Sequence, residues 1–164
     1  MQARVKWVVA VVVLLCAISG ALAQTVPSFS GNFSFVPDSP RMRSVVATLG
    51  VEQTATSIQL TRTVNGKAEV EKYMLDGSTS EWKTTTGIPI KAFVTWHGSE
   101  LWFDSIATPT INGRTMRLHS TQRWQLSKDS DTIKVRMETD APDMPAEVSS
   151  AAFQPYVDVF KRTK

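Results

Sequence analysis

The chain has 164 residues, of which 42% are hydrophobic and 20% charged, and it carries a formal net charge of +3 with one cysteine. This length suits one domain with its own hydrophobic core, and no internal repeat or low-complexity tract divides it. Two of the 18 basic residues, Arg4 and Lys6, lie in an N-terminal targeting segment, so the rest of the chain is nearly balanced in charge. The composition gives little support to nucleic-acid binding, and we expect no nucleic-acid partner.

Residues 1–23 match a secretory signal peptide. Arg4 and Lys6 precede the apolar run 7-WVVAVVVLLCAI-18, which the small-residue tripeptide Ala21-Leu22-Ala23 follows. This run is shorter than the roughly 20 residues needed to span a bilayer. We therefore expect cleavage before Gln24 rather than a membrane anchor.

Cleavage would leave residues 24–164 as a single domain. The mature chain would lack the one cysteine, Cys16, so it would contain no disulfide. We expect it to be secreted, to the periplasm or the extracellular space, without stable membrane insertion. The sequence does not identify a protein partner.

After the segment 30-SGNFSFVPDS-39, the sequence predicts an antiparallel meander. Only 37-PDSPRMRSVVATL-49 suits a short irregular or helical segment of a turn or two. From there on, turn signals recur at short intervals, and the runs between them are rich in Thr, Val, Ile and aromatic residues. These signals are Val64-Asn65-Gly66, Asp76-Gly77-Ser78, Thr86-Gly87-Ile88-Pro89, His97-Gly98-Ser99, Ile111-Asn112-Gly113 and Lys128-Asp129-Ser130-Asp131.

The first hairpin of the meander turns at Asn65-Gly66. A two-residue turn there would place Leu60 opposite Glu71, a carboxylate on an apolar face. We therefore predict a three-residue loop with Gly66 in a left-handed bulge, which pairs Leu60 with Val70. That register also turns Lys72 toward the inner face, opposite Ile58.

Three later loops agree on which residues lie on the inner face of the sheet and which lie on the outer face. Two-residue turns at Gly98-Ser99 and Asn112-Gly113, followed by a four-residue loop at 128–131, keep the apolar faces of the strands together. The predicted inner rows are Trp96, Leu101, Trp124 and Val135, and then Val94, Phe103, Gln122 and Met137.

A long meander with one apolar face predicts an all-β protein. Short loops keep sequence neighbours adjacent in space, and closure leaves no sheet edge, which favours an up-and-down barrel over a sandwich. We expect about eight strands, with an interior that is filled or holds one small ligand.

The segment 30-SGNFSFVPDS-39 followed by the meander resembles the small bacterial lipocalin-like barrels of the calycin type. In that family the first strand opens with a Gly-x-Trp pattern, and here Gly31 and Phe33 hold the outer positions. Arg162, in the C-terminal strand 154-QPYVDVFKRTK-164, is the basic residue that would cover the ring. The resemblance implies a lipocalin-like barrel over residues 24–164, a cavity, secretion and a non-enzymatic binding role; it transfers no binding residue.

Polar residues on the inner face predict where a ligand would bind. Arg62 and Lys72 would present two cations to a small apolar molecule with an acidic end, in a pocket of about a few hundred Å³. The alternative is that both residues lie at the barrel mouth and extend their charged ends into water. The candidate cavity residues are Arg62, Lys72, Trp96, Phe103, Ser105, Ser120, Gln122 and Trp124.

The outer face suggests a second function. The predicted register aligns Trp102, Arg123 and Arg136 in one row, which could bind an anionic partner or a protein. The alternative is an amphipathic cover of the sheet, with arginine stacked on tryptophan.

No catalytic signature is present. His97 is predicted to oppose Glu100 at a hairpin tip, and His119 to lie on the outer face. Neither has a nucleophile or second metal ligand at a diagnostic spacing. We expect no enzyme activity, no metal and no cofactor.

Overall fold

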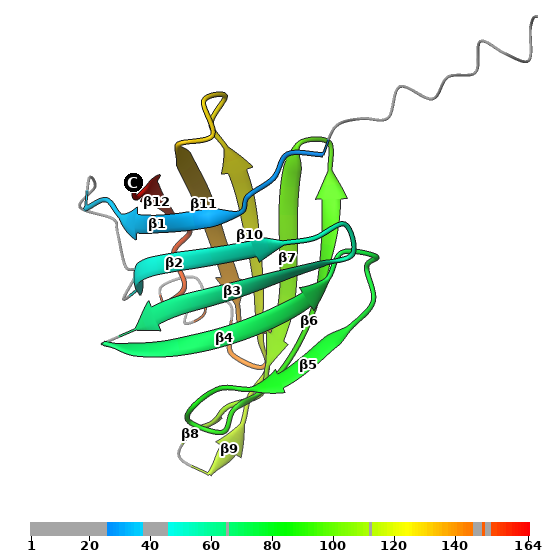
Figure 1. Ribbon diagram of the computed structural model, residues 1–164. Helices are drawn as coiled ribbons and strands as arrows, with labels where there is room; N and C mark the ends of the chain where they lie inside the picture. Colours follow the sequence, from blue (N-terminus) through cyan, green and yellow to red (C-terminus); the bar gives the residue numbers. More distant parts are fainter. Residues whose placement is uncertain (1–25, 38–45, 65, 112, 146–148, 150–151) are drawn as a thin grey trace, which may run out of the picture.

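The computed structural model describes residues 26–37, 46–64, 66–111, 113–145, 149 and 152–164 (Figure 1). The predicted signal peptide lies outside this range. The strands are β1 Gly31–Phe35, β2 Val46–Gln53, β3 Ser57–Val64, β4 Lys67–Met74, β5 Ser80–Lys83, β6 Pro89–His97, β7 Glu100–Ala107, β8 Thr110–Ile111, β9 Arg114–Thr115, β10 Leu118–Leu126, β11 Thr132–Asp140 and β12 Tyr156–Arg162.

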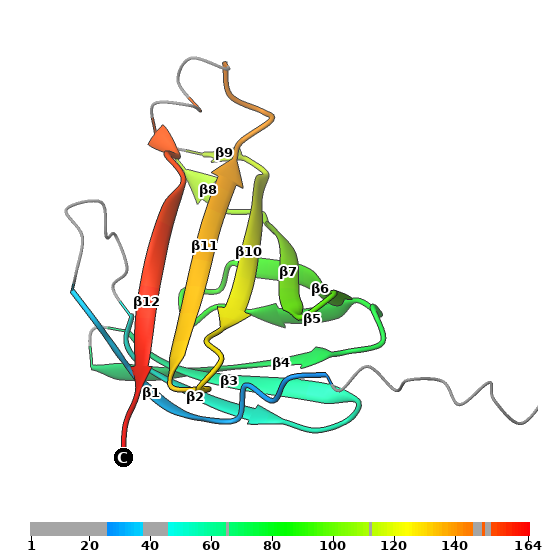
Figure 2. The ribbon, with the colours of Figure 1, turned by 90° about the horizontal axis from the view of Figure 1, so that it is seen from above.

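Ten of these strands form one antiparallel sheet in the order β4-β3-β2-β1-β12-β11-β10-β7-β6-β5, and β8 and β9 form a separate ribbon. The sheet curls so that β1 to β4 cross the front of the molecule and β6, β7, β10 and β11 run behind them (Figures 1 and 2). The predicted all-β antiparallel meander is confirmed. The predicted count of about eight strands is wrong: some strands are short, such as β5 with four residues, so the same chain length forms more of them.

The barrel is nearly closed, with one gap. This gap lies between β4 and β5, which are the two ends of the sheet order. Side chains bridge this gap in place of a backbone ladder. The rings of Tyr73 and Trp82 meet edge-on at 5.1 Å, and Thr85 Oγ1 donates to Glu69 Oε1 at 2.8 Å. The expectation of a sheet without edges thus holds everywhere except between β4 and β5.

The register of the later meander is confirmed. Trp96 pairs with Leu101, Leu101 with Trp124, and Trp124 with Val135. The next row, from Val94 through Phe103 and Gln122 to Met137, also forms as predicted. Consistent parity across three loops was therefore sufficient to place both faces.

The register of the β3–β4 hairpin is not the predicted one. Val64 pairs with Lys67, so the turn has two residues, and Leu60 lies opposite Glu71 rather than Val70. Lys72 pairs with Gln59 on the outer side and is exposed. The predicted bulge at Gly66 is wrong because the inward Glu71 finds partners inside the barrel, which removes the cost that argued against it.

No helix lies between β1 and β2 in the described residues. Val46–Leu49, the end of the segment predicted to be irregular or helical, belongs to β2, and residues 38–45 of that segment lie outside the described range. Before β12, Ser149 and Ala152 are helical, and Ser149 N donates to Pro145 O and Phe153 N to Ser149 O. Within the described residues, no helix has the length and apolarity to cross a membrane.

Gly31, Phe33 and Arg162 form the contact that the resemblance implied. Arg162 Cζ lies 4.6 Å from the centre of the Phe33 ring, and Arg162 Nη1 donates to Ser30 O at 2.8 Å. Gly31 has a φ of 144°, and a Cβ at this position would overlap the Arg162 guanidinium. This position therefore requires glycine.

Aromatic rings fill one part of the interior. Tyr73 and Phe103 meet at 5.1 Å, and Phe103 and Trp124 at 4.8 Å. Phe29, which precedes β1 and is fully buried, packs against both Trp124 and Trp96. Rings therefore fill the interior around Tyr73, Phe103 and Phe29.

Candidate functional site

A cavity of about 120 Å³ lies beside Trp124. Its walls come from β2, β3, β10, β11 and β12. Apolar and polar side chains are interspersed in this lining, since Leu49 lies opposite Arg62 and Val135 lies opposite Asp158. The lining residues are Val46, Leu49, Arg62, Gln122, Trp124, Val135, Met137, Tyr156, Asp158 and Phe160.

Arg62 is the cation in this lining, and its side chain is 15% exposed. Its Nε lies 3.2 Å from Glu71 Oε2, and its Nη2 donates to Gln122 Oε1 at 3.2 Å. Its Cζ lies 5.9 Å from the centre of the Trp124 ring. Three neighbours from two strands, β4 and β10, therefore fix the position of the guanidinium.

Glu71 balances this charge. Tyr73 donates its hydroxyl hydrogen to Glu71 Oε2 at 2.7 Å. Burial alone would lower the pKa of Arg62, but the charge of Glu71, together with smaller contributions from Tyr73 and Tyr156, raises that pKa above its ordinary value. Burial, followed by the charge of Glu71, raises the pKa of Tyr73 well above its ordinary value. Arg62 thus remains charged and Tyr73 remains a donor.

The side-chain amide of Gln122 has one possible orientation. Its Oε1 accepts from Arg62 Nη2 and from Trp124 Nε1, each at 3.2 Å. Guanidinium and indole groups only donate hydrogen bonds, so exchanging the amide O and N would place donor against donor. The Gln122 NH₂ group therefore points away from both, and within the part of the chain that the structure describes it donates no hydrogen bond.

Three of the eight candidate cavity residues, Arg62, Gln122 and Trp124, line the cavity. Phe103 is buried in the aromatic core, and Trp96 is half-buried against Phe29. The other three lie elsewhere: Lys72 is exposed on the outer side, Ser105 Oγ donates to Ser120 O, and Ser120 Oγ bonds Thr139 Oγ1.

The sequence analysis missed three ionisable groups at this site: Glu71, Tyr156 and Asp158. Asp158 is 5% exposed and, like Tyr156, lines the cavity. The alternating pattern of Tyr156, Asp158 and Phe160 on the last strand was a usable signal, since period two places all three on one face. A two-residue turn at Asn65-Gly66 would have predicted that Glu71 lies on the inner face, opposite Leu60.

The outer row forms as predicted, with Trp102 opposite Arg123 and Arg123 opposite Arg136. Arg123 Cζ lies 4.3 Å from the centre of the Trp102 ring. Glu138 Oε2 lies 3.5 Å from Arg123 Nη2, and Glu138 Oε1 lies 2.8 Å from Arg136 Nε. The two arginines already share an anion of the protein itself, so no observation favours a bound anionic partner.

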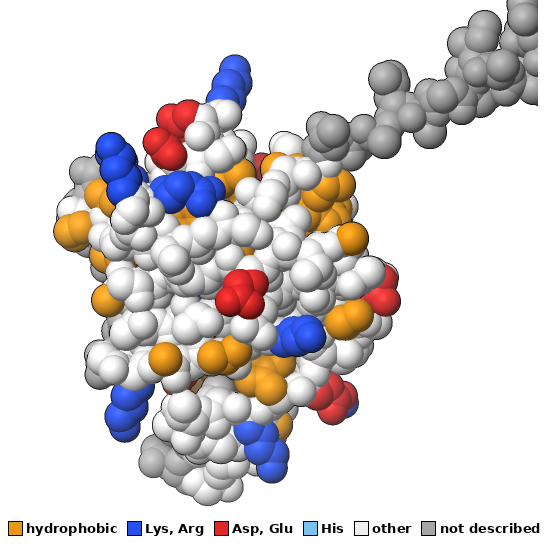
Figure 3. Space-filling model, viewed as in Figure 1, with side chains coloured by type: hydrophobic (Ala, Val, Ile, Leu, Met, Phe, Trp, Pro, Cys, Tyr) orange, Lys and Arg blue, Asp and Glu red, His pale blue; other side chains and the backbone are white. Residues whose placement is uncertain are grey.

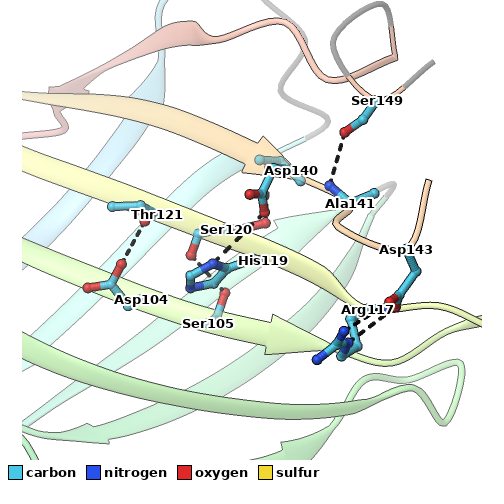
Figure 4. A network of polar contacts seen from close by, with 11 residues as sticks. Asp104, Ser105, Arg117, His119, Ser120, Thr121, Asp140, Ala141, Asp143 and Ser149 are labelled. Atoms are coloured by element: carbon cyan, nitrogen blue, oxygen red, sulfur yellow. Dashed lines mark hydrogen bonds and ion pairs between the residues drawn. The ribbon is translucent and has the colours of Figure 1, made fainter. Parts of the chain in front are cut away.

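In the described residues, neither histidine belongs to a group of side chains suited to catalysis or metal binding. His97 opposes Glu100, as predicted, and stacks on Trp102 at 4.1 Å. Figure 4 shows His119 beside Asp140, at 3.9 Å, with the separate pairs Thr121–Asp104 and Arg117–Asp143 nearby. No group of three or more His, Cys, Asp or Glu residues in the described range could hold a metal ion.

A hollow of about 600 Å³ lies on the outer surface over β1, β2 and β3. Its outward side chains are small and mostly uncharged, including Asn32, Thr48, Thr61 and Thr63. Figure 3 shows this face, on which side chains of this kind predominate. The hollow offers neither an apolar wall of side chains nor an aromatic platform, and the interior cavity is the better candidate site.

No protein-family model and no curated protein matches this sequence. Solved structures do match in fold. The REP1-NXSQ fatty acid transporter is 12% identical with a TM-score of 0.53, covering 82% of this chain and 96% of that one. The fluorescent protein UnaG is 12% identical with a TM-score of 0.51, covering 83% and 96%. Lipid binding protein 8 of Caenorhabditis elegans is 10% identical with a TM-score of 0.52, covering 85% and 99%.

In fold this chain is a β-barrel like these three proteins, which agrees with the predicted resemblance at the level of the fold. Identities this low show the fold alone. Two of the three proteins are described as a fatty acid transporter and a lipid binding protein.

Proposed function

We propose that this protein is a secreted, non-enzymatic binding protein that holds one small apolar molecule inside its barrel. The observation that carries the proposal is the cavity beside Trp124, whose lining combines apolar side chains with a few polar groups. Such a lining both buries a ligand and orients it. Two of the compared structures are described as lipid or fatty acid proteins, which supports the same class of function.

The size of the cavity limits the ligand. A volume of about 120 Å³ suits a molecule near the size of one aromatic ring, since an apolar protein cavity of about 150 Å³ accommodates benzene. The aromatic core fills the rest of the interior near Tyr73, Phe103 and Phe29, so a long acyl chain would require those rings to move. The proposed ligand is therefore compact.

Native mass spectrometry of the mature protein from its own host tests this function without a guess about the ligand. We expect a bound species of low mass, and a rise in melting temperature when single-ring compounds are added. Apo protein alone, together with no stabilisation by any compound of a single-ring panel, would remove the proposal. An exported form beginning at Gln24 would separately support secretion.

A further inference from the structure

We infer that the cavity takes a neutral ligand whose polar end accepts hydrogen bonds, and that it discriminates against carboxylic acids. The inference rests on the proposed function, because it specifies what the same cavity holds. It reverses the simplest interpretation of an inward arginine, which is a counter-ion for an acidic ligand.

The charge of the site carries the first step. The positive charge of Arg62 is already balanced by Glu71 at 3.2 Å. A carboxylate that entered would lose part of its hydration between the walls of the cavity. In return it would meet a guanidinium whose field Glu71 largely cancels. A neutral polar group has far less hydration to lose.

The hydrogen-bond inventory carries the second step. A guanidinium has five N–H donors, and the hydrogen bond described for Arg62 engages one Nη2 hydrogen, while its Nε lies at ion-pair distance from Glu71 without a hydrogen-bond partner among the described residues. The Gln122 NH₂ group donates to no described residue, and its orientation is fixed by two donor-only neighbours. Arg62 and Gln122 therefore provide donors in the lining that a carbonyl oxygen would satisfy without bringing a charge.

The apolar part of the lining carries the third step. Leu49, Val135 and Phe160 are buried and contribute no polar side-chain atom to the wall. A cavity of about 120 Å³ with these residues in its wall suits the body of one aromatic ring. The ligand class is thus a ring-sized neutral carbonyl compound.

Benzamide and benzoate form a matched pair for the test, since they share shape and heavy-atom number and differ in charge. Calorimetric titration near neutral pH would measure both, with toluene as an apolar probe that has no polar end. We expect the wild-type protein to bind benzamide about tenfold or more tightly than benzoate.

Glu71→Gln provides the decisive variant. Glutamine keeps the size of the side chain and an acceptor for Tyr73, but it removes the charge that balances Arg62. We expect this variant to gain benzoate affinity by about tenfold or more, while toluene binding stays unchanged. Glu81→Gln is the matched control, because Glu81 is exposed and pairs with Lys91 on the outer side. It should leave the preference of the wild type intact.

The outcomes separate the two proposals. If none of the three probes binds either protein, the proposed function fails. If toluene binds but the wild-type protein takes benzoate as well as benzamide, the function stands and the charge argument is wrong. The wild-type comparison decides the question even if Glu71→Gln does not fold.

Discussion

Two arginines of this protein lie over tryptophan rings and pair with glutamates, one inside the barrel and one outside. Inside, Arg62 lies 5.9 Å from the Trp124 ring and 3.2 Å from Glu71. Outside, Arg123 lies 4.3 Å from the Trp102 ring and 3.5 Å from Glu138. The residue types are the same, yet the inner arginine side chain is 15% exposed and the outer one 34%.

This difference shows that burial, rather than residue type, decides what such a group does. The outer guanidinium can exchange its carboxylate for water, so its contacts cover the sheet and contribute little net free energy. The inner guanidinium has little water to replace a lost partner, so Glu71, Gln122 and Trp124 must all be in place. A site with fixed geometry results only on the inside.

The largest expected difference between the two regions comes from the tryptophans. Trp124 is 1% exposed and contacts the rings of Phe29 and Phe103, so Trp124→Ala should lower the free energy of unfolding by about 3–5 kcal/mol. Trp102 is half-buried between His97 and Arg123, and Trp102→Ala should cost about 1 kcal/mol. Urea denaturation would measure both. Equal losses would show that the outer row is part of the core.

The arginines should differ by a smaller amount. Arg62→Met leaves Glu71 charged in the interior and should cost about 3 kcal/mol, whereas Arg123→Met should cost less than about 1 kcal/mol. Thermal or urea unfolding of the two variants would test this.

A double variant identifies the cause of the inner loss. Arg62→Met combined with Glu71→Gln removes both charges, and it should recover at least half of the free energy that Arg62→Met loses. If the double variant is less stable than Arg62→Met alone, the loss comes from packing of the arginine side chain rather than from the unpaired carboxylate.

The two regions also differ in how well the sequence predicted them. For β6, β7, β10 and β11, every two-residue turn placed apolar residues opposite one another, and periodicity alone gave the correct faces. For the β3–β4 hairpin, the correct turn placed Glu71 opposite Leu60 on the inner face, and an argument from apolar pairing rejected it. Periodicity cannot show that Arg62 and Tyr73 will meet that carboxylate.

The site itself was predictable only in part, for a related physical reason. Arg62, Gln122 and Trp124 followed from local alternation along β3 and β10. The location of the cavity depends on which strands oppose one another across the barrel, and on Phe29, which fills the space beside Trp96 from outside the strand pattern. Such contacts between distant segments leave no periodic trace in the sequence.

The smallest expected effect uses alkaline pH to distinguish the inner network from the outer one. Burial and Glu71 raise the pKa of Tyr73 well above 10.0, its ordinary value, so the folded protein keeps a proton that the unfolded chain releases. The stability that this provides is complete below that value and is lost as pH rises above it, by about 1.4 kcal/mol near pH 11. Tyr73→Phe should remove this loss, because phenylalanine has no proton to release.

Urea denaturation at a series of pH values would measure this effect as the difference in unfolding free energy between wild type and Tyr73→Phe, in which the titration of lysines common to both proteins cancels. The difference should shrink as pH rises above the pKa of free tyrosine. Arg123→Met is the outer counterpart: it leaves Tyr73 and Glu71 intact, so it should keep the full alkaline loss of the wild type. A difference between wild type and Tyr73→Phe that does not change with pH would mean that the Tyr73 hydroxyl ionises as easily in the folded barrel as in water. In that case the interior around Arg62 would be as well hydrated as the outer row, and the contrast between the two arginines would not hold.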